Sequence, residues 1–598
     1  MPISFSLSTE QLQSLHSAHS EPIPELEVAR SNIQALRAAP QTQVVLAQTQ
    51  HLMDNIEKIP QTSYTFYRLF LRTGDRENYQ TPYFLKRARL AAATLRLFLG
   101  QTELKDSVQD YLWNICEESN WVLPAHERCV IDLFAAETGF VLAETLLLLG
   151  DTLDAEIRHR VHTEVERRIF DPYIRYHHLD SWYRGHHNWN GVCNSSIAAT
   201  FLLLEPEPER MLHALQLALT GLEVFLETAF EEDGSSTEGV AYWHYGLINF
   251  VALSEMLRAR SKGAIDLLST EKMRHIAAYP AKMQLSGSWF ASFSDCDETV
   301  AFNPGIIVRL AERTGEQSLL NLLADAVKPE GDWRLTMMLR NLLWWDGNQR
   351  EAVPPSDARL PDAGVARLVT LTPQGTPVIV AIKAGHNAEN HNQNDVGSFI
   401  VHVEGENLLT DPGRGLYSRA YFGLHRYENI FTNSYGHSVP RIGGQLQRAG
   451  REFAGTLLES TSTQDAYKQA DVEFGRAYPC TDLVSARRRL LLATGDSEAG
   501  TLWLHDHFTF AETPQEVQEA FVTWFDCIVY EATALIQGQH HDLRLTIEQP
   551  QKVYFALERL EEQCKENKKP GVLRRLSVIL PLATEVDVRI RMELLNKS

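Results

Sequence analysis

Apolar residues recur at helical spacing through most of the first 345 positions of the chain. Short turns of Gly, Pro or Asp separate many of these segments, which is the pattern of antiparallel helix pairs packed in series. No repeat of fixed length stands out, so the pattern favours an irregular helical toroid over a regular solenoid. The clearest predicted helices span 84–100, 130–150, 155–170, 211–230 and 247–260.

The pattern changes after residue 345. Residues 346–365 contain three prolines and predict a linker. Strand-like alternation follows, with Gly and Asx turns between several strands, as in antiparallel sheets stacked in a sandwich. We therefore predict the α+β multidomain class, with an N-terminal (α/α) toroid over 1–345 and a C-terminal antiparallel β-sandwich over 366–598. The predicted strands are 365–371, 378–385, 396–405, 501–510, 543–549 and 586–594.

Composition and charge narrow the class of protein. The chain has 56 Lys and Arg against 77 Asp and Glu, and the net charge of −21 argues against nucleic acid as a partner. No apolar run is long enough to predict a membrane span. The seven cysteines are scattered without a CxxC pair, and the N-terminus lacks a signal-peptide pattern. We expect a cytoplasmic protein without a membrane partner, or a periplasmic or secreted one if a leader has been removed; no pattern indicates the oligomeric state.

The first of three polar stretches covers residues 182–194, immediately before the apolar helical run 197–204. It contains two His, three Asn and two Trp. N-capping by Asn and packing of Trp would account for any one of these residues. The whole cluster also suits a sugar ring, because it combines planar aromatic rings with amide groups.

The second stretch covers residues 233–246, where a DGSS turn precedes two tyrosines three positions apart. Ser236 or Thr237 would cap a following helix, and Tyr242 and Tyr245 would share one face of it. Either tyrosine is equally a core residue with a satisfied hydroxyl. A phenol also serves as a general acid or base when neighbouring cations lower its pKa.

The third stretch covers residues 386–395, between two strongly alternating strands, and is followed by Asp411-Pro412-Gly413 and by residues 435–438. An ordinary long loop is one interpretation of this stretch. The residue types are also those that ligate divalent metals or contact a substrate.

Together these stretches resemble the heparinase II/III-like superfamily of polysaccharide lyases. The matching pieces are HNWNGVCN (187–194), DGSSTEGVAYWHYG (233–246), HNQNDVGSFIVHVEGENLLTDPGRGLY (391–417) and YGHS (435–438). Members join an (α/α) toroid to a β-sandwich and typically cleave uronic-acid-containing polysaccharides by β-elimination. The resemblance implies a polysaccharide lyase acting on glycosaminoglycans such as hyaluronan, chondroitin sulfate or heparan sulfate, as polymers or oligosaccharides.

The resemblance also implies catalytic roles. Asn188 would bind the uronate carboxylate, with assistance from His187 or Asn190. Tyr242 would protonate the leaving oxygen, with Tyr245 as the competing assignment, and His391 would contact the uronate or act as the second base. Donors at the carboxylate are needed because removal of the C5 proton creates an enolate dianion. The remaining predicted substrate contacts are Arg184, Trp189, Glu238 and Arg426.

A divalent metal is also implied, since members often bind one through the second His of an H-x-H-x-D motif, an Asp before Pro-Gly and a later His. Here Gln393 replaces that second histidine, whereas Asp411 and His437 match the other positions. An amide oxygen is a poorer ligand for Zn²⁺ than imidazole but suits Mn²⁺ or Ca²⁺. We predict a structural metal at Gln393, Asp411 and His437, of identity Mn, Zn or Ca.

Local charge supports an acidic substrate. Residues 412–441 hold four arginines against the single acid Glu428, giving 4 − 1 = +3, and arginine forks suit carboxylate and sulfate oxygens. Three alternatives stay open: an alginate or oligoalginate lyase, a non-catalytic carbohydrate-binding protein, and a glycoside hydrolase. The hydrolase would need two carboxylates across the bond; the candidates are Asp233, Glu238, Asp295 and Asp395.

Overall fold

The computed structural model describes residues 5, 7–8, 10–11, 14–15, 21–324, 334–458, 466–495 and 498–597. The chain divides into two compact units. A helical unit comprises residues 1–230, 242–277 and 301–351, and a sandwich unit comprises residues 231–241, 278–300 and 352–598. The last crossing between the units, after Glu351, falls inside the predicted linker. The two short segments 231–241 and 278–300 correct the prediction of one continuous helical domain over 1–345, because they pack with the sandwich.

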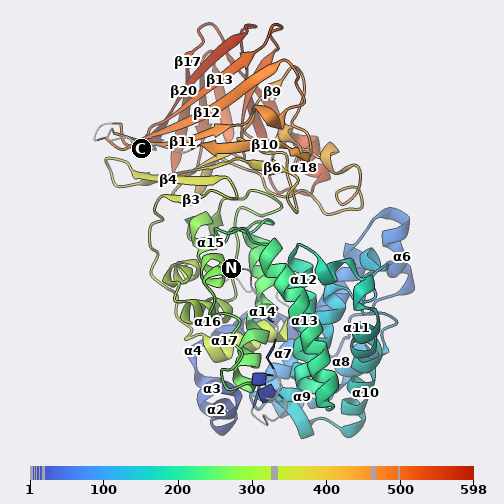
Figure 1. Cartoon of the computed structure of the whole chain (residues 1–598). Helices are drawn as coiled ribbons and strands as arrows, with labels where there is room; N and C mark the ends of the chain where they lie inside the picture. The colour runs from blue at the N-terminus through green and yellow to red at the C-terminus, as the bar shows by residue number, and fades with distance from the viewer. Residues whose placement is uncertain are drawn as a thin grey trace. The chain divides into compact units, whose positions relative to one another are not determined.

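Helices account for most of the helical unit, and Figure 1 shows their arrangement. The central helix is α9 (Leu133–Leu149), which packs against α7, α12 and α17. The other helices, two of which cross a unit boundary, are α2 (Glu25–Ser31), α3 (Ile33–Ala38), α4 (Pro40–Gln48), α5 (Gln50–Met53), α6 (Tyr64–Thr73), α7 (Glu77–Phe98), α8 (Lys105–Glu117), α10 (Ala155–Val165), α11 (Asp171–Tyr176), α12 (Asn188–Leu204), α13 (Pro208–Thr228), α14 (Val240–Arg260), α15 (Glu271–Met283), α16 (Pro304–Thr314) and α17 (Leu335–Trp344).

Sequence signals fix the ends of these helices. In α16, the Asn303 side chain accepts a hydrogen bond from the Ile306 amide, and Pro304 occupies the first turn. Gly315 ends the helix with φ +75°, a left-handed conformation that glycine adopts without strain. The same rules begin α9, where Asp132 accepts from the Ala135 amide.

The helix α9 is unusually apolar. Among the described residues, one segment, Leu133–Thr152, is long and apolar enough to cross a membrane by length and composition. However, 83% of that window is buried inside the structure. The two acids of α9 are both paired: Glu137 with Arg334 and Glu144 with Arg340. The segment therefore has the properties of a core helix.

The sandwich unit contains three antiparallel sheets whose apolar faces share one core. The nine-stranded sheet has the order β15-β16-β17-β20-β13-β12-β11-β10-β6, the five-stranded sheet β3-β4-β5-β7-β8 and the four-stranded sheet β18-β19-β14-β9. Strands β12 and β13 show strict alternation of buried and half-buried residues over most of their length, as expected for a sheet with one face on the core. A separate hairpin, β1 (Gln284–Ser286) and β2 (Trp289–Phe290), lies in segment 278–300.

The strands of the sandwich are β3 (Ala358–Leu360), β4 (Val365–Leu371), β5 (Pro377–Lys383), β6 (Gly385–Asn387), β7 (Phe399–Val403), β8 (Glu406–Leu409), β9 (Arg441–Ile442), β10 (Gly450–Leu458), β11 (Tyr467–Glu473), β12 (Leu483–Ala493), β13 (Leu502–Phe510), β14 (Val517–Thr523), β15 (Asp526–Tyr530), β16 (Thr533–Gln537), β17 (His541–Gln549), β18 (Phe555–Arg559), β19 (Arg574–Ile579) and β20 (Glu585–Asn596). One short helix, α18 (Glu561–Glu566), lies between β18 and β19.

Candidate functional site

One polar cluster of the sandwich unit is centred on Asp295, which is 2% exposed. Asp295 lies in segment 278–300, while its partners come from the loops that follow β6 and β8. Its Oδ2 atom is 3.0 Å from Nδ1 of His391 and accepts from Nη2 of Arg426 at 2.9 Å. Its Oδ1 atom accepts from the Tyr421 hydroxyl at 2.5 Å and from the Gln393 amide at 3.2 Å.

These contacts keep Asp295 ionised. Burial alone would raise the pKa of Asp295. The hydrogen bond from His391 and the positive charge of Arg426 outweigh burial and hold that pKa below its usual value. The cluster therefore contains a buried anion at neutral pH, surrounded by donors.

His391 is the imidazole of this cluster, and 17% of its side chain is exposed, against 14% for the side chain of Arg426. Its Nδ1 faces Asp295, and its Nε2 lies 3.6 Å from a carboxylate oxygen of Glu238, which is itself buried. The rings of Tyr417 and Phe422 lie beside the imidazole, each with a centroid separation of 6.3 Å. An imidazole oriented by a carboxylate, with its second nitrogen directed elsewhere, is suited to proton transfer or to binding an anionic group.

The Arg426 guanidinium has hydrogen-bond partners within the sandwich unit, and its contact with substrate stays a prediction. This guanidinium donates to Asp295, to the carbonyl of Asn392 at 2.7 Å and to the carbonyl of Tyr421 at 3.3 Å. Arg414 is likewise paired, with Asp297 at 3.1 Å. Two of the four arginines counted between residues 412 and 441 are thus paired with acids from segment 278–300, so the predicted local excess of positive charge is smaller than the sequence count.

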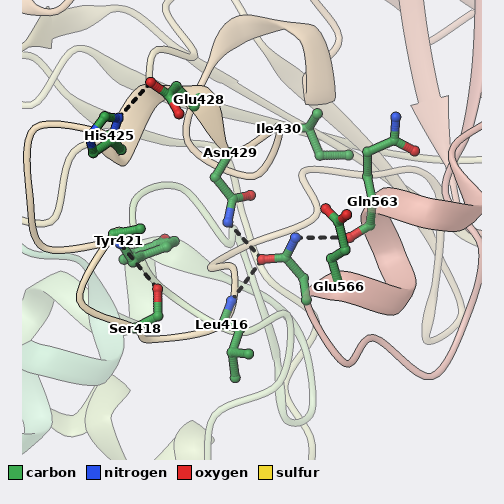
Figure 2. Close-up of a pocket in the computed structure, with 11 residues that line it drawn as sticks. Leu416, Ser418, Tyr421, His425, Glu428, Asn429, Ile430, Gln563 and Glu566 are labelled. Carbon is green, nitrogen blue, oxygen red and sulfur yellow. Dashed lines mark hydrogen bonds and ion pairs between the residues drawn. The ribbon is translucent and has the colours of Figure 1, made fainter. Parts of the chain in front are cut away.

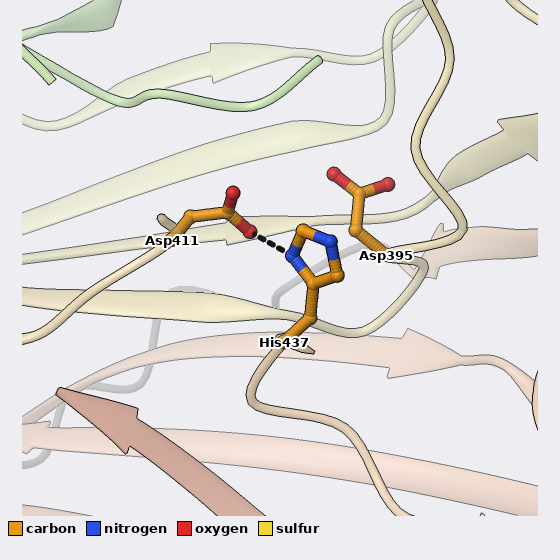
Figure 3. A group of neighbouring side chains, drawn as sticks. All are labelled: Asp395, Asp411 and His437. Atoms are coloured by element: carbon orange, nitrogen blue, oxygen red, sulfur yellow. Dashed lines mark hydrogen bonds and ion pairs between the residues drawn. The ribbon is translucent and has the colours of Figure 1, made fainter. Parts of the chain in front are cut away.

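A second buried cluster joins Asp395, Asp411 and His437 (Figure 3). Each residue offers a ligand atom, and these atoms lie within 4.8 Å of one another. Asp411 Oδ2 is 2.9 Å from His437 Nδ1 and accepts from the Ser398 hydroxyl. Within the described residues, Asp395 Oδ2, Asp411 Oδ1 and His437 Nε2 have no hydrogen-bond partner. Three buried polar atoms left without partners are the condition that a bound cation would satisfy.

The neighbours of this cluster modify the predicted ligand set. Gln393 donates its amide nitrogen to Asp295, and its buried amide oxygen has no hydrogen-bond partner among the described residues. Asp395, which was not among the predicted ligands, stands with Asp411 and His437. Lys383 donates to the other oxygen of Asp395 at 2.7 Å. Burial raises the pKa of Asp395, and the charge of Lys383 partly opposes that rise.

In the helical unit, the stretch 187–194 begins helix α12. The His187 side chain accepts from the Trp189 amide and caps the helix. Asn188 is buried in the first turn, and Trp189 is half-buried with its ring 4.7 Å from that of His126. Asn190 donates to the Gly185 carbonyl and accepts from Asn194 at 2.8 Å. Because both ends of its amide are engaged in the fold, the prediction that Asn190 contacts substrate is not supported.

Tyr242 and Tyr245 both lie in helix α14 and are half-buried. The Tyr245 hydroxyl donates to Glu137 at 3.2 Å, and the Arg334 guanidinium lies 4.8 Å from its ring centroid. Burial, with the negative charge of Glu137, raises the pKa of Tyr245 well above its usual value. Tyr245 is thus tied to Glu137 and Arg334 within the helical unit, and the assignment of Tyr242 or Tyr245 as the catalytic phenol stays a prediction. Arg184 is exposed, 6.0 Å from the Tyr183 ring.

Tyr421 also lines a pocket of about 330 Å³, with residues from the loop 416–430 and from α18 (Figure 2). One wall is fixed by Asn567, which accepts from the Leu416 amide and from Asn429 at 2.7 Å. His425 and Glu428 form an exposed pair on its rim. His391 and Asp295 are not among the lining residues, so this pocket is distinct from the cluster around Asp295.

Sequence reasoning missed the role of Asp295. It named this residue only as one of four carboxylates for a hydrolase, because no periodicity or spacing connects Asp295 with a histidine 96 positions later. Two of the other hydrolase candidates, Asp233 and Asp395, have partners within the fold. Asp233 accepts from the Ser235 amide and the Asp362 amide, and Asp395 is bound to Lys383. Among the residues described, these carboxylates do not form an accessible acid pair.

Comparison with known proteins bears on both units. Residues 352–512 match the family model described as heparinase II/III-like, C-terminal. A heparinase III structure is similar with a TM-score of 0.61 at 14% identity, over 88% of this chain and 78% of that chain. A mutant of the heparan sulfate lyase from Pedobacter heparinus is similar with a TM-score of 0.59 at 13% identity, over 92% of this chain and 83% of that chain. A mutant chondroitin AC lyase from Streptomyces coelicolor is similar with a TM-score of 0.52 at 14% identity, over 96% of this chain and 83% of that chain. No curated protein matches the sequence.

At these identities the structural likeness establishes the fold: an (α/α) toroid and an antiparallel β-sandwich in one chain, as the periodicity predicted. The match over residues 352–512 gives the sandwich unit a heparinase II/III-like C-terminal domain. The predicted resemblance to the heparinase II/III-like superfamily of polysaccharide lyases is confirmed.

Proposed function

We propose that this protein is a polysaccharide lyase that cleaves uronic-acid-containing glycosaminoglycans, as polymers or oligosaccharides, by β-elimination. The observation that carries the proposal is His391, a partly exposed imidazole of the heparinase II/III-like domain that contacts the buried carboxylate Asp295. Similar structures are named heparinase III, heparan sulfate lyase and chondroitin AC lyase, which supports a glycosaminoglycan as the substrate class.

The reaction needs a base at C5 of the uronate and an acid at the glycosidic oxygen. In our proposal, His391 Nε2 takes the C5 proton, because Nδ1 is engaged with Asp295. The electron pair of that C–H bond forms the C4–C5 double bond while the bond from C4 to the glycosidic oxygen breaks. The leaving oxygen takes a proton from Tyr242. No water enters the products, so the chain needs no activated nucleophile.

The second requirement is neutralisation of the uronate carboxylate. Asn188 is the proposed amide donor, since it is buried in the first turn of α12 and the family resemblance assigns it this role. A pre-placed donor stabilises the enolate-like charge as it develops and so lowers the barrier to proton removal. Glu238, facing His391, and the rings of Tyr417 and Phe422 are proposed as contacts for the sugar.

We also propose that Asp395, Asp411 and His437 hold a divalent cation, with the amide oxygen of Gln393 as a further ligand. Their buried atoms without partners support this, and a set of oxygens with one imidazole suits Mn²⁺ or Ca²⁺ as well as Zn²⁺. The bound ion would supply structural support to the loop that carries His391. The alternative is charge balance by Lys383 and a protonated His437 without any metal.

The function is tested by incubating the protein separately with hyaluronan, chondroitin sulfate, heparan sulfate and alginate, and following ultraviolet absorbance of the unsaturated uronyl product. We expect the chromophore with at least one glycosaminoglycan. Absorbance with alginate alone would replace the proposed substrate class. New reducing ends without absorbance would indicate a hydrolase, and neither signal would indicate a binding protein.

The metal is tested by elemental analysis of the purified protein, His437→Ala and His425→Ala. We expect one divalent ion per chain in the wild type and in His425→Ala, whose substitution is at an exposed position, and loss of the ion in His437→Ala. A wild-type protein without metal, even after dialysis against Mn²⁺, Ca²⁺ and Zn²⁺ in turn, would favour the balance by Lys383.

A further inference from the structure

We propose that Asp295 is the positioning residue for His391: it fixes which nitrogen of the imidazole faces the substrate, and it does so from a segment outside the matched family domain. This inference rests on the proposed lyase function. Asp295 is not proposed to contact substrate, since it is buried and its two oxygens already receive hydrogen bonds from the side chains around it.

Asp295 contacts the imidazole ring of His391. Because His391 Nδ1 lies 3.0 Å from the ionised Asp295, this nitrogen carries a proton that it donates to the carboxylate. Nε2 is then the nitrogen directed away from Asp295, 3.6 Å from a carboxylate oxygen of Glu238. Without Asp295, the ring would lose the contact that selects this tautomer and orientation, and fewer molecules would present Nε2 as a base.

Asp295 also contacts the backbone of His391. His391 has φ +55°, a left-handed conformation that a non-glycine residue adopts only at some cost in energy. The Asp295 amide donates to the His391 carbonyl at 3.2 Å. Asp295 therefore constrains the same histidine twice, through the ring by its carboxylate and through the main chain by its amide.

The Asp295 carboxylate is itself held by neighbouring side chains. The Nη2 atom of Arg426 donates both to Asp295 and to the carbonyl of Asn392, the residue after His391. Tyr421 donates to the opposite oxygen of Asp295, and the Arg426 guanidinium lies 4.5 Å from the Tyr421 ring centroid. The carboxylate is thus held at both oxygens, so its orientation toward His391 is determined by more than one contact.

The decisive experiment is a double-mutant cycle on the full chain with the best glycosaminoglycan substrate. Asp295→Asn, His391→Ala and the double variant are compared in kcat and KM. We expect Asp295→Asn to lower kcat by about 10²- to 10⁴-fold, the usual contribution of a positioned acid or base, with KM changed by less than about threefold. In the His391→Ala background, Asp295→Asn should cause almost no further loss, because residues that act as a unit are not additive.

Multiplicative losses in the cycle, or a rise in KM with kcat retained, would overturn the proposal. The matched control is Asp297→Asn, two positions along the same segment: Asp297 is exposed and pairs with Arg414, so kcat and KM should both stay at wild-type values. If Asp295→Asn does not fold, Tyr421→Phe serves instead. It removes one hydrogen bond to Asp295 without touching His391, and it should lower kcat in the wild-type background and not in His391→Ala.

Failure of the proposed function is a separate result. If the wild type releases no unsaturated product from any polymer, the lyase assignment fails, and the positioning of His391 is read from crystal structures of the wild type and Asp295→Asn. A His391 ring that turns away from its wild-type orientation in the variant supports positioning by Asp295. A ring and a left-handed backbone that stay unchanged would refute it.

Discussion

Each unit contains a buried carboxylate that collects an arginine, a tyrosine and an amide. In the helical unit, Glu137 accepts from Arg334, Tyr245 and Asn249. In the sandwich unit, Asp295 accepts from Arg426, Tyr421 and Gln393, and it also holds His391. The two sets are alike in donor chemistry. Asp295 also accepts from the Tyr417 hydroxyl at 3.5 Å, and the difference with a chemical consequence is His391.

That one residue separates a structural cluster from a candidate catalytic one. Glu137 lies within the core helix α9, and its Tyr245 partner has a pKa raised by burial and by the carboxylate, which makes it harder to ionise. Asp295 lies between a hairpin and a helix, and its His391 partner is accessible. A network of buried polar groups is thus poor evidence of catalysis unless one member reaches solvent in a protonation state that the network sets.

The largest effect is expected from replacing His391, the histidine of the Asp295 cluster. His391→Ala should lower kcat/KM on the best glycosaminoglycan by about 10³-fold or more, because the proposed C5 base is removed. Initial rates of ultraviolet absorbance give the measurement. His425→Ala is the control at an exposed histidine of the loop that follows β8, and it should keep wild-type rates. A His391→Ala variant with more than a tenth of wild-type activity would break the comparison, since neither carboxylate would then serve a catalytic group.

The next largest effect concerns Glu137, the buried carboxylate of the helical unit. Glu137→Gln leaves the Arg334 guanidinium without its ionic partner, and breaking a buried pair costs about 3 kcal/mol of folding free energy. We expect urea denaturation to show this loss in the helical unit. The kcat of the folded fraction should stay within about threefold of the wild type.

The opposite pattern in Glu137→Gln, unchanged stability with kcat lowered at least a hundredfold, would place Glu137 in the catalytic machinery. Tyr245→Phe is the companion variant, because it removes only the neutral hydrogen bond to Glu137. It should cost about 1 kcal/mol and leave kcat unchanged.

A smaller effect is expected in the pH dependence of the stability of each unit, since each unit buries a neutral histidine. Burial lowers the pKa of His244, in the helical unit, to about 3, and that of His402, in the sandwich, to about 4. Below the ordinary value of 6.5 the unfolded chain binds protons that the folded chain cannot. The stability that each neutral histidine contributes is therefore fully present well above pH 6.5 and is lost as the pH falls, by about 1 kcal/mol for each histidine between pH 6.5 and 5.5.

Urea denaturation at pH 7.5 and 5.5 measures this dependence. His244→Asn should reduce the pH dependence of the helical unit, and His402→Asn that of the sandwich unit. His178→Asn, at an exposed position, should leave both dependences as they are in the wild type. Equal pH dependence in all four proteins would show that neither buried histidine remains neutral in the folded chain.

The smallest effect is expected at the exposed ion pair of the same segment. Arg414→Ala removes a partner from Asp297, and exposed pairs contribute at most about 1 kcal/mol. Thermal denaturation should show a shift near the limit of detection. A loss larger than about 2 kcal/mol would mean that segment 278–300 depends on surface charge as well as on Asp295.

Much of the fold could be predicted from the sequence, because periodicity depends on local burial. The predicted strand 365–371 coincides with β4, and helix α9 falls within the predicted span 130–150. The site was harder to predict than the fold, because a sequence pattern identifies residue types but not the residues with which they form hydrogen bonds. Arg426 was predicted to meet substrate, yet its partner Asp295 lies 131 positions earlier. For Asn190 a local signal existed: Asn194 lies four positions later on one helix, where side chains can meet.

The interleaving of the two units has a consequence for how the protein is made. Segments 231–241 and 278–300 leave the ribosome before any strand from β3 onward, yet they pack with those strands. They must therefore wait for their partners while the chain between them is already forming helices. A gene fragment that begins at residue 352 would encode the matched family domain without Glu238 or Asp295. Recombination or truncation at the apparent domain boundary would thus separate His391 from both carboxylates that flank it.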